Sequence, residues 1–418
     1  MMKRFIAAGV TVVAGLIAGA EVLDRPSGFK IGERMTLRPS VAFSATYDSN
    51  VDPYYSKRSL ASSHDRRKDD YFWTISPALM LDYEAETWAF ILSGFYNYRQ
   101  YASDCHRNYN RHNYGENFRF NWSNSAGAEK GWSVVLGQGF QQVTMADDIV
   151  DGAGTYSGDS RQFHFEGTLQ RRFNEFWHAD IDASYYWLDY DNDVKGRYAF
   201  YGWDRAQIGL ETGLAPSKWT DFILRGAYQY FDQDNAKGSR NSNSSDAFML
   251  QVGVASYMTE RISYRLLGGW SHFRYADSSD TSDGFVYTVS GNWKIGETWN
   301  TMLLGTSYYQ PSERQYSSKS RIDAVSWGIA KQMVRGKLRA TLDIRYRRET
   351  HEYISGSSYD YVLDIWSGRL GVDYSFCRFL SAFAYGEYQN SSNSEASTRN
   401  GAYDYDRWRV TVGLRLAY

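Results

Sequence analysis

Apolar and polar residues alternate along most of the chain after residue 20. Residues 407–418 show this best, because one face holds only apolar or aromatic side chains: Trp408, Val410, Val412, Leu414, Leu416 and Tyr418. The intervening positions include three arginines and a threonine. A two-residue period places successive side chains on opposite faces of a β-strand. The pattern therefore predicts an all-β protein whose strands have one apolar and one polar face.

The alternation predicts about 18 strands of about 10–15 residues each. Soluble strands average about 5–6 residues, whereas a tilted strand needs about 9–11 residues to cross a membrane. Strands of this length favour membrane crossing. The predicted strands are 35–47, 70–83, 87–101, 112–123, 131–144, 160–172, 176–190, 200–214, 219–232, 245–258, 261–275, 283–295, 298–310, 320–333, 337–349, 360–374, 378–390 and 403–418.

The connections between these strands alternate in length. Turns such as 84–86 and 215–218 are short, whereas 48–69, 146–159 and 391–401 are long and rich in Ser, Asn, Asp and Gly. Short turns on one rim and long loops on the other are typical of outer-membrane barrels. We therefore predict a transmembrane antiparallel up-and-down β-barrel of 16–18 strands, in the outer membrane of a Gram-negative cell. An even strand count places both chain ends in the periplasm.

Aromatic residues gather near the predicted strand ends, where amphipathic rings suit the headgroup level of a membrane. The sequence predicts one girdle beside the short turns: Trp73, Trp88, Trp132, Trp177, Trp219, Trp293 and Trp299. It predicts a second girdle toward the long loops: Tyr47, Tyr96, Tyr98, Tyr228 and Tyr230.

The first twenty residues have the pattern of an export signal. Lys3 and Arg4 precede an apolar stretch, and Ala18-Gly19-Ala20 fits the small-x-small rule, so we predict cleavage after Ala20. The alternative is an uncleaved membrane anchor, although the apolar stretch is short for one. The predicted organisation is a signal peptide at 1–20, a short periplasmic segment at 21–34 and a barrel at 35–418.

Composition narrows the functional classes. Lys+Arg 46 against Asp+Glu 48 gives a net charge of -2, without the strong basic field of a nucleic-acid-binding protein. Aromatics at 17% argue against disorder, and charged residues at 22% against a bundle of membrane helices. Two cysteines provide neither a disulfide framework nor a metal cluster. We predict no cofactor, no metal and no nucleic-acid partner.

The polar face of each strand is expected to line the barrel lumen. On the last four strands this assigns a basic set to the lumen: Arg339, Arg345, Arg369, Arg409 and Arg415. On the sixth to eighth strands it assigns an acidic set: Glu166, Asp180, Asp182 and Glu211. In a ring of about 18 strands these sets lie opposite each other, which predicts a transverse field for charged solutes. The alternative is that lumen charges simply pair across neighbouring strands and fill space.

The last strand, with its apolar alternation and terminal Tyr418, resembles the C-terminal signal that the barrel-assembly machinery reads in Gram-negative outer-membrane proteins. The usual terminal residue there is Phe. The resemblance implies that this machinery is a partner, beside outer-membrane lipid and lipopolysaccharide.

Two short motifs are similar to those of the beta-barrel porin type 2 family. The first strand ends in a Tyr-Asp-x-Asn element and the third in Tyr-Arg-x-Tyr, formed here by Tyr47, Asp48 and Asn50 and by Tyr98, Arg99 and Tyr101. Some members of this family are encoded with exopolysaccharide machinery. The resemblance implies a channel that passes a polysaccharide through the outer membrane with periplasmic export proteins.

Three other functions stay open. A diffusion porin for small solutes needs the same lumen without export partners, and a structural or adhesive barrel needs no transport. An outer-membrane lipase or protease would need a histidine beside a nucleophile or carboxylates. His272 lies near the predicted lipid face without an acidic or Asn neighbour on its own strand, and the predicted loop histidines are His64, His106, His112 and His351. We predict a channel rather than an enzyme.

Overall fold

The computed structural model is all-β. It describes residues 28–50, 69–102, 112–124, 131–144, 159–190, 202–217, 219–233, 244–259, 261–275, 281–311, 318–353, 361–393 and 405–418. The strands are β1 (Phe29–Ile31), β2 (Met35–Asp48), β3 (Asp70–Glu84), β4 (Trp88–Tyr101), β5 (His112–Ser123), β6 (Gly131–Thr144), β7 (Asp159–Arg172), β8 (Trp177–Tyr190), β9 (Trp203–Ser217), β10 (Thr220–Gln233), β11 (Ser245–Thr259), β12 (Ile262–Tyr275), β13 (Thr281–Ile295), β14 (Trp299–Pro311), β15 (Ser318–Met333), β16 (Leu338–Tyr353), β17 (Tyr361–Ser375), β18 (Leu380–Asn393) and β19 (Tyr405–Ala417).

Strands β2 to β19 confirm the eighteen predicted strands, with ends that differ by a few residues. The largest difference is in β16, which continues to Tyr353 rather than ending at 349. Its last residues are polar on both faces, so no alternation marks them. The three-residue β1 is too short to produce a periodic pattern and was not predicted.

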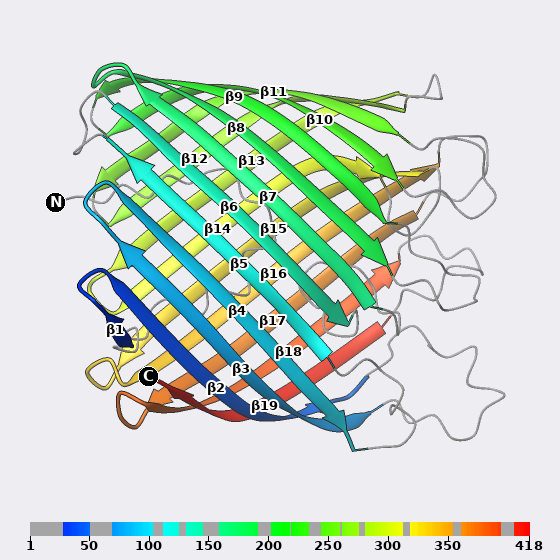
Figure 1. Ribbon diagram of the computed structural model, residues 1–418. Coiled ribbons are helices and arrows are strands. Elements are labelled where there is room, and N and C mark those ends of the chain that lie inside the picture. Colours follow the sequence, from blue (N-terminus) through cyan, green and yellow to red (C-terminus); the bar gives the residue numbers. More distant parts are fainter. Residues whose placement is uncertain are drawn as a thin grey trace.

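Each long strand pairs antiparallel with its neighbours in the chain, and the sheet closes where β19 pairs with β2. In Figure 1 the short turns and the C-terminus lie at one rim, together with β1. The opposite strand ends lead into connections that are mostly outside the described residues. This is the predicted up-and-down barrel of eighteen strands.

The girdle prediction is wrong for Trp73. β3 runs from the rim of long connections toward a short turn, and Trp73 lies near its Asp70 end. There its ring neighbours Phe43 at 6.3 Å and Tyr98 at 5.8 Å. The other six predicted tryptophans lie at or next to the strand ends of the short-turn rim.

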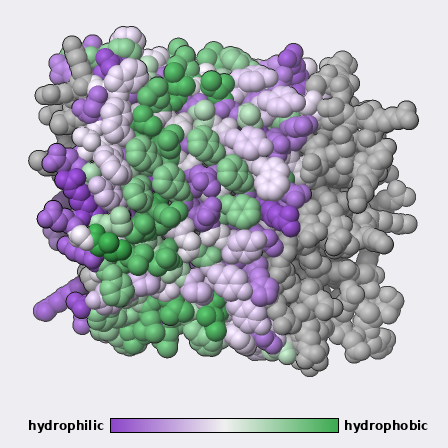
Figure 2. Space-filling model, viewed as in Figure 1, coloured by the Kyte–Doolittle hydropathy of each residue, from purple (hydrophilic) through white to green (hydrophobic). Residues whose placement is uncertain are grey.

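The two faces of the wall differ sharply in character, as β19 shows. Its outward residues from Trp408 to Leu416 are 51–56% exposed, whereas Arg407 and Thr411 between them are each 2% exposed. Figure 2 shows that hydrophobic residues form a band across the visible face of the wall, with hydrophilic residues toward the short-turn rim. In lipid every backbone group must be paired internally, and a closed barrel achieves this. The architecture is that of a Gram-negative outer-membrane protein.

Among the described residues, no helix is long and apolar enough to span a bilayer.

Both ends of the described chain meet at the short-turn rim. The Tyr418 ring stacks on Phe29 of β1 at 4.0 Å and on Phe379 at 5.2 Å, and its amide donates to the Pro39 carbonyl at 3.1 Å. The predicted assembly signal therefore lies along the outer face of the closing strand. Residues 1–20 are outside the described residues, so cleavage after Ala20 stays a prediction.

Candidate functional site

The inner face of the barrel carries the candidate site. Every predicted lumen residue has inward parity on its strand, and all but Arg339 have an exposed outward residue beside them. Glu211 is 5% exposed beside Leu210 at 59%, and Arg369 precedes Leu370 at 62%. The placed residues are Arg339, Arg345, Arg369, Arg409 and Arg415 on β16, β17 and β19, and Glu166, Asp180, Asp182 and Glu211 on β7, β8 and β9. Their role in transport stays a prediction.

The acidic side is interleaved with arginines from strands further along the barrel. Arg225 of β10 lies 3.3 Å from an Asp182 oxygen and 3.9 Å from a Glu211 oxygen. Arg265 of β12 also donates to Glu211. Guanidinium groups thus compensate two of the four predicted carboxylates, as the pairing alternative expected.

Asp180 belongs to a second group near the short-turn rim. Its carboxylate lies 3.4 Å from Nδ1 of His178 and accepts a hydrogen bond from Gln170 at 3.2 Å. Asp221 of β10 approaches the other ring nitrogen of His178 at 4.0 Å. These residues form a polar belt across β7, β8 and β10.

Glycines let several of these side chains lie flat against the wall. A Cβ at Gly209 would lie 2.5 Å from an Asp182 oxygen, and one at Gly137 would lie 2.8 Å from Glu166. Gly213 leaves similar room for the His178 ring. Any larger side chain at these glycines would push the charged group toward the barrel axis, so the glycines keep this part of the lumen wide.

On the basic side, two arginines lie over aromatic rings. Arg369 lies 3.3 Å from Glu387 and 4.0 Å above the Tyr385 ring, and Arg415 stacks over Phe383 at 5.4 Å. Within the described residues, no carboxylate lies within ion-pair distance of Arg345 or Arg415. The lumen therefore has a quadrant rich in arginines backed by aromatic rings.

Arg409 takes part in a structural ion pair as well. Its Nε donates to Asp48 at 2.8 Å, and Arg407 binds the same carboxylate through Nε at 3.0 Å and Nη2 at 2.5 Å. Asn50 adds a backbone bond to Asp48 at 3.1 Å. The Tyr-Asp-x-Asn motif thus fastens β2 to β19, a role that sequence reasoning missed.

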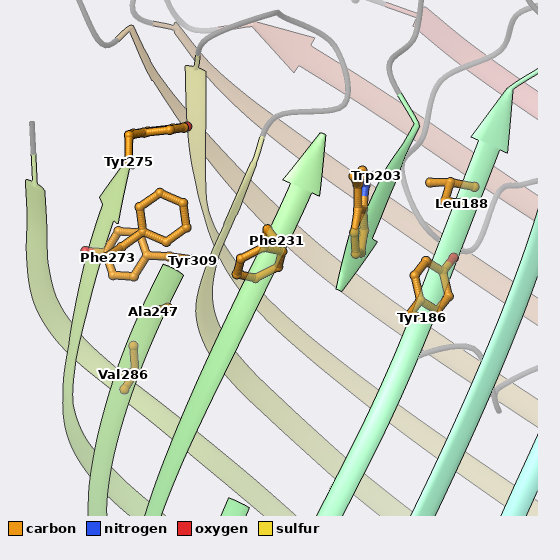
Figure 3. Packing of buried hydrophobic residues seen from close by; sticks show 9 residues of the cluster. All are labelled: Tyr186, Leu188, Trp203, Phe231, Ala247, Phe273, Tyr275, Val286 and Tyr309. Carbon is orange, nitrogen blue, oxygen red and sulfur yellow. The ribbon is translucent and has the colours of Figure 1, made fainter. Parts of the chain in front are cut away.

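An aromatic cluster covers the inner wall of β8 to β14 near the rim of long connections. Figure 3 shows its members close to the ends of their strands: Tyr186, Leu188, Trp203, Phe231, Ala247, Phe273, Tyr275, Val286 and Tyr309. Arg205 lies 5.8 Å from the Tyr186 ring and 5.9 Å from that of Trp203. The alternation in the sequence shows that these residues face inward, but it does not show that they lie at the same level along the barrel axis.

The structure places two of the predicted loop histidines, His351 and His112, on strands. His351 is not in a loop but on the inner face of β16, 2% exposed. Its Nδ1 lies 2.8 Å from the Ser320 hydroxyl and its Nε2 lies 3.0 Å from Glu349. His272 has no acidic or Asn neighbour on its own strand, as predicted, but Asp283 of the adjacent β13 lies 2.7 Å from its Nδ1.

Two further points concern these histidines. The Ser320 hydroxyl is 1% exposed, so it cannot meet a substrate from solvent. His112 lies on the outer face of β5 and bonds to the Tyr96 hydroxyl, while His64 and His106 are outside the described residues.

Comparisons with known proteins add little to this geometry. No model of a protein family matches the chain, and no curated protein matches it by sequence. Among solved structures it is similar to the siderophore receptor PirA from Acinetobacter baumannii, at 9% identity and a TM-score of 0.46, covering 93% of this chain and 81% of the receptor. The ferric enterobactin receptor PfeA from Pseudomonas aeruginosa and the FrpB iron transporter from Neisseria meningitidis each give 8% identity and a TM-score of 0.45, covering 93% of this chain and 82% of theirs.

Structural similarity this low says nothing about which ligands the chain binds. The assignment as an outer-membrane barrel rests on the closed strand pairing and the apolar outer wall. The resemblance to the porin type 2 family is not supported by a family match.

Proposed function

We propose that this chain is a channel that passes hydrophilic, charged material across the outer membrane. The observation that carries the proposal is the contrast between the two faces of the wall. The outer face is apolar, whereas the inner face holds charged side chains that lie flat over glycines. A barrel of about 16–18 strands leaves room for an aqueous lumen.

The finer proposal is export of an acidic polysaccharide with periplasmic partners. Arg345 and Arg415 offer positive charge to an anionic group, and Tyr385 and Phe383 offer ring faces next to arginines. Arginine forks suit carboxylates and phosphates, and aromatic rings suit the apolar faces of sugars. A diffusion porin for small anions is the second candidate, since the same arginines would favour anions. Neither candidate includes catalysis.

Single-channel recording in a planar bilayer tests the channel. We expect steady conductance and a reversal potential under a salt gradient that reports anion preference. The double variant Arg345→Gln and Arg415→Gln should shift the reversal potential toward cations, because both charges face the lumen. Arg378→Gln removes a charge from an exposed short turn and should leave selectivity unchanged. An unchanged reversal potential in the double variant would contradict the role of this quadrant.

Polysaccharide export and anion diffusion predict different phenotypes when the gene is deleted. If the chain exports a polysaccharide, deleting its gene abolishes surface polysaccharide, and the double arginine variant restores less than the wild type. If it is a diffusion porin, surface polysaccharide is unaffected, while uptake of small anions falls.

A further inference from the structure

The lipid-facing wall contains a carboxylate inside its apolar band, just below the tyrosines of the girdle toward the long loops, which neither the fold nor the proposed channel requires. Glu116 is exposed on the outer face of β5, between Tyr114 and the apolar Phe118. It lies six residues above Trp122, whose neighbour in register is Trp88 of the short-turn girdle. On a strand tilted by about 40°, six residues rise about 15 Å along the membrane normal, which is well inside an apolar band about 25 Å tall.

The surroundings of Glu116 do not satisfy it. Its neighbours in register are Gly94 on β4 and Phe140 on β6, neither of which has a polar side chain. Its hydrogen bond is from Gln138 Nε2 at 3.4 Å, longer than the usual range of about 2.7–3.2 Å. A polar group in lipid without good partners is costly, and ionisable residues at this depth usually mark a functional contact.

The wall around Glu116 is hollowed. An open groove runs across β3 to β6, lined on its outer side by Pro77, Leu79, Gly94, Tyr96, Tyr114 and Phe140. Gly94 has no side chain to fill it, and a Cβ there would meet nothing closer than 3.8 Å. In membranes, small residues at a surface allow backbones to approach closely.

Glu116 and Gln138 are matched in height. Gln138 lies six residues above Trp132 of the same girdle, as Glu116 does above Trp122. A two-fold axis along the membrane normal preserves height and exchanges sides. Rotation about such an axis through this groove would therefore bring Gln138 of each copy opposite Glu116 of the other. A carboxyl group and a primary amide complement each other as donors and acceptors, so the pair is complementary to itself.

We propose that the groove over β3 to β6 is an interface with a second copy of this chain, held by reciprocal Glu116–Gln138 hydrogen bonds. The bonds satisfy in the dimer the polar groups that lipid leaves unsatisfied in the monomer. The proposal concerns the outer wall alone and does not depend on what the lumen conducts.

Cysteine crosslinking in native outer membranes tests the interface. In a background with Cys105→Ser and Cys377→Ser, the variant Phe118→Cys places a thiol directly below Glu116, near the proposed axis. We expect oxidation to give a dimer band. Val252→Cys on β11 is the matched control, since this residue is 59% exposed on another part of the outer wall, and it should give no dimer.

A second set of variants separates the interface from folding. In the Phe118→Cys background, adding Glu116→Leu and Gln138→Leu should reduce the dimer band to the level of Val252→Cys. Glu116→Gln keeps a hydrogen-bonding group and should retain the band. Heat-modifiable gel mobility checks that each barrel is folded. Equal crosslinking at both cysteine sites, a dimer band that survives both leucines in a folded barrel, or a monomeric mass for the wild type in lipid nanodiscs would overturn the proposal. A different polypeptide held at this groove would also overturn it.

Discussion

The β19–β2 seam and the β13–β14 seam join strands of similar length, but their ladders differ. β19 pairs with β2 from Arg409 opposite Asp48 to Ala417 opposite Ser40. Its end toward the long connections carries the ion pairs of Asp48, which is 1% exposed, and a hydrogen bond of 2.8 Å between the Thr46 and Thr411 hydroxyls. The seam that joins the two ends of the barrel is therefore secured by buried polar contacts.

The ladder between β13 and β14 stops halfway. Pairing runs from Ile295 opposite Trp299 to Thr288 opposite Thr306, and the upper halves of the two strands are not paired with each other. Side chains of β15 replace part of the ladder. Arg321 donates from Nη2 to the Phe285 carbonyl at 3.2 Å, and Lys319 bonds to the Ser282 hydroxyl.

The two ladders differ because a turn connects β13 to β14, whereas nothing but contacts across the seam connects β19 to β2. A short turn around Gly296 joins β13 to β14 at one rim, so covalent connection preserves the lower half of that ladder. No turn joins β19 to β2. Unpaired backbone is costly in lipid, so the open half needs substitutes, of which the bond from Arg321 to the Phe285 carbonyl is one. Removing side-chain contacts at the two seams should therefore lower the stability of the barrel by different amounts.

The largest effect is expected from Asp48→Asn. The amide keeps the shape of the carboxylate but removes the negative charge that Arg407 and Arg409 both contact. Removing one partner of a buried ion pair costs about 3–5 kcal/mol. Urea unfolding in phospholipid vesicles, followed by tryptophan fluorescence, measures the loss of unfolding free energy.

Asp406→Asn is the control on the same strand. Asp406 lies on the exposed face and accepts bonds of 2.8 Å from Tyr388 and Asn390. We expect this change to cost about 1 kcal/mol or less. Equal losses in the two variants would show that the buried pair does not hold the seam.

A smaller effect is expected from Arg321→Met. The methionine fills similar space but cannot donate to the Phe285 carbonyl, and a polar group left without a partner in apolar surroundings costs about 1–3 kcal/mol. Because the ladder is already open there, the loss should appear locally. Hydrogen exchange should become faster in residues 281–287 and stay unchanged in β2. Uniformly faster exchange would mean that the seam does not open as a separate unit.

The sequence predicted the strands well because lipid and water face opposite sides of one wall. Alternation failed only where both faces meet polar surroundings, as at the end of β16, where Arg348 and His351 lie on opposite faces. The same parity assigned Arg345 and Glu211 to the lumen, and it could also have identified Glu116 as an outward carboxylate. The alternation of inward and outward positions therefore predicts much of the fold and identifies the residues that line the lumen.

Parity does not reveal which residues meet. Arg265 and Glu211 lie on strands that are not neighbours, so their contact depends on the curvature of the wall. Asp48 and Arg407 come from opposite ends of the chain and meet only because the sheet closes. The half-open ladder was not predicted either, since β13 opens with Thr-Ser-Asp-Gly, which has no apolar face and resembles an ordinary polar strand end. The site's chemistry was thus partly predictable, but its pairing was not.

The smallest effect is expected at the hydroxyl pair of the β19–β2 seam. Thr46→Val leaves the buried Thr411 hydroxyl without this partner and should cost about 1 kcal/mol. Thr46→Val with Thr411→Val removes both hydroxyls at similar volume, so the double variant should recover much of the loss. Vesicle unfolding of the two single variants and the double variant gives the coupling energy directly. If the losses simply add, the hydroxyls do not interact across the seam, and its strength at this end lies in the Asp48 ion pairs and the backbone ladder.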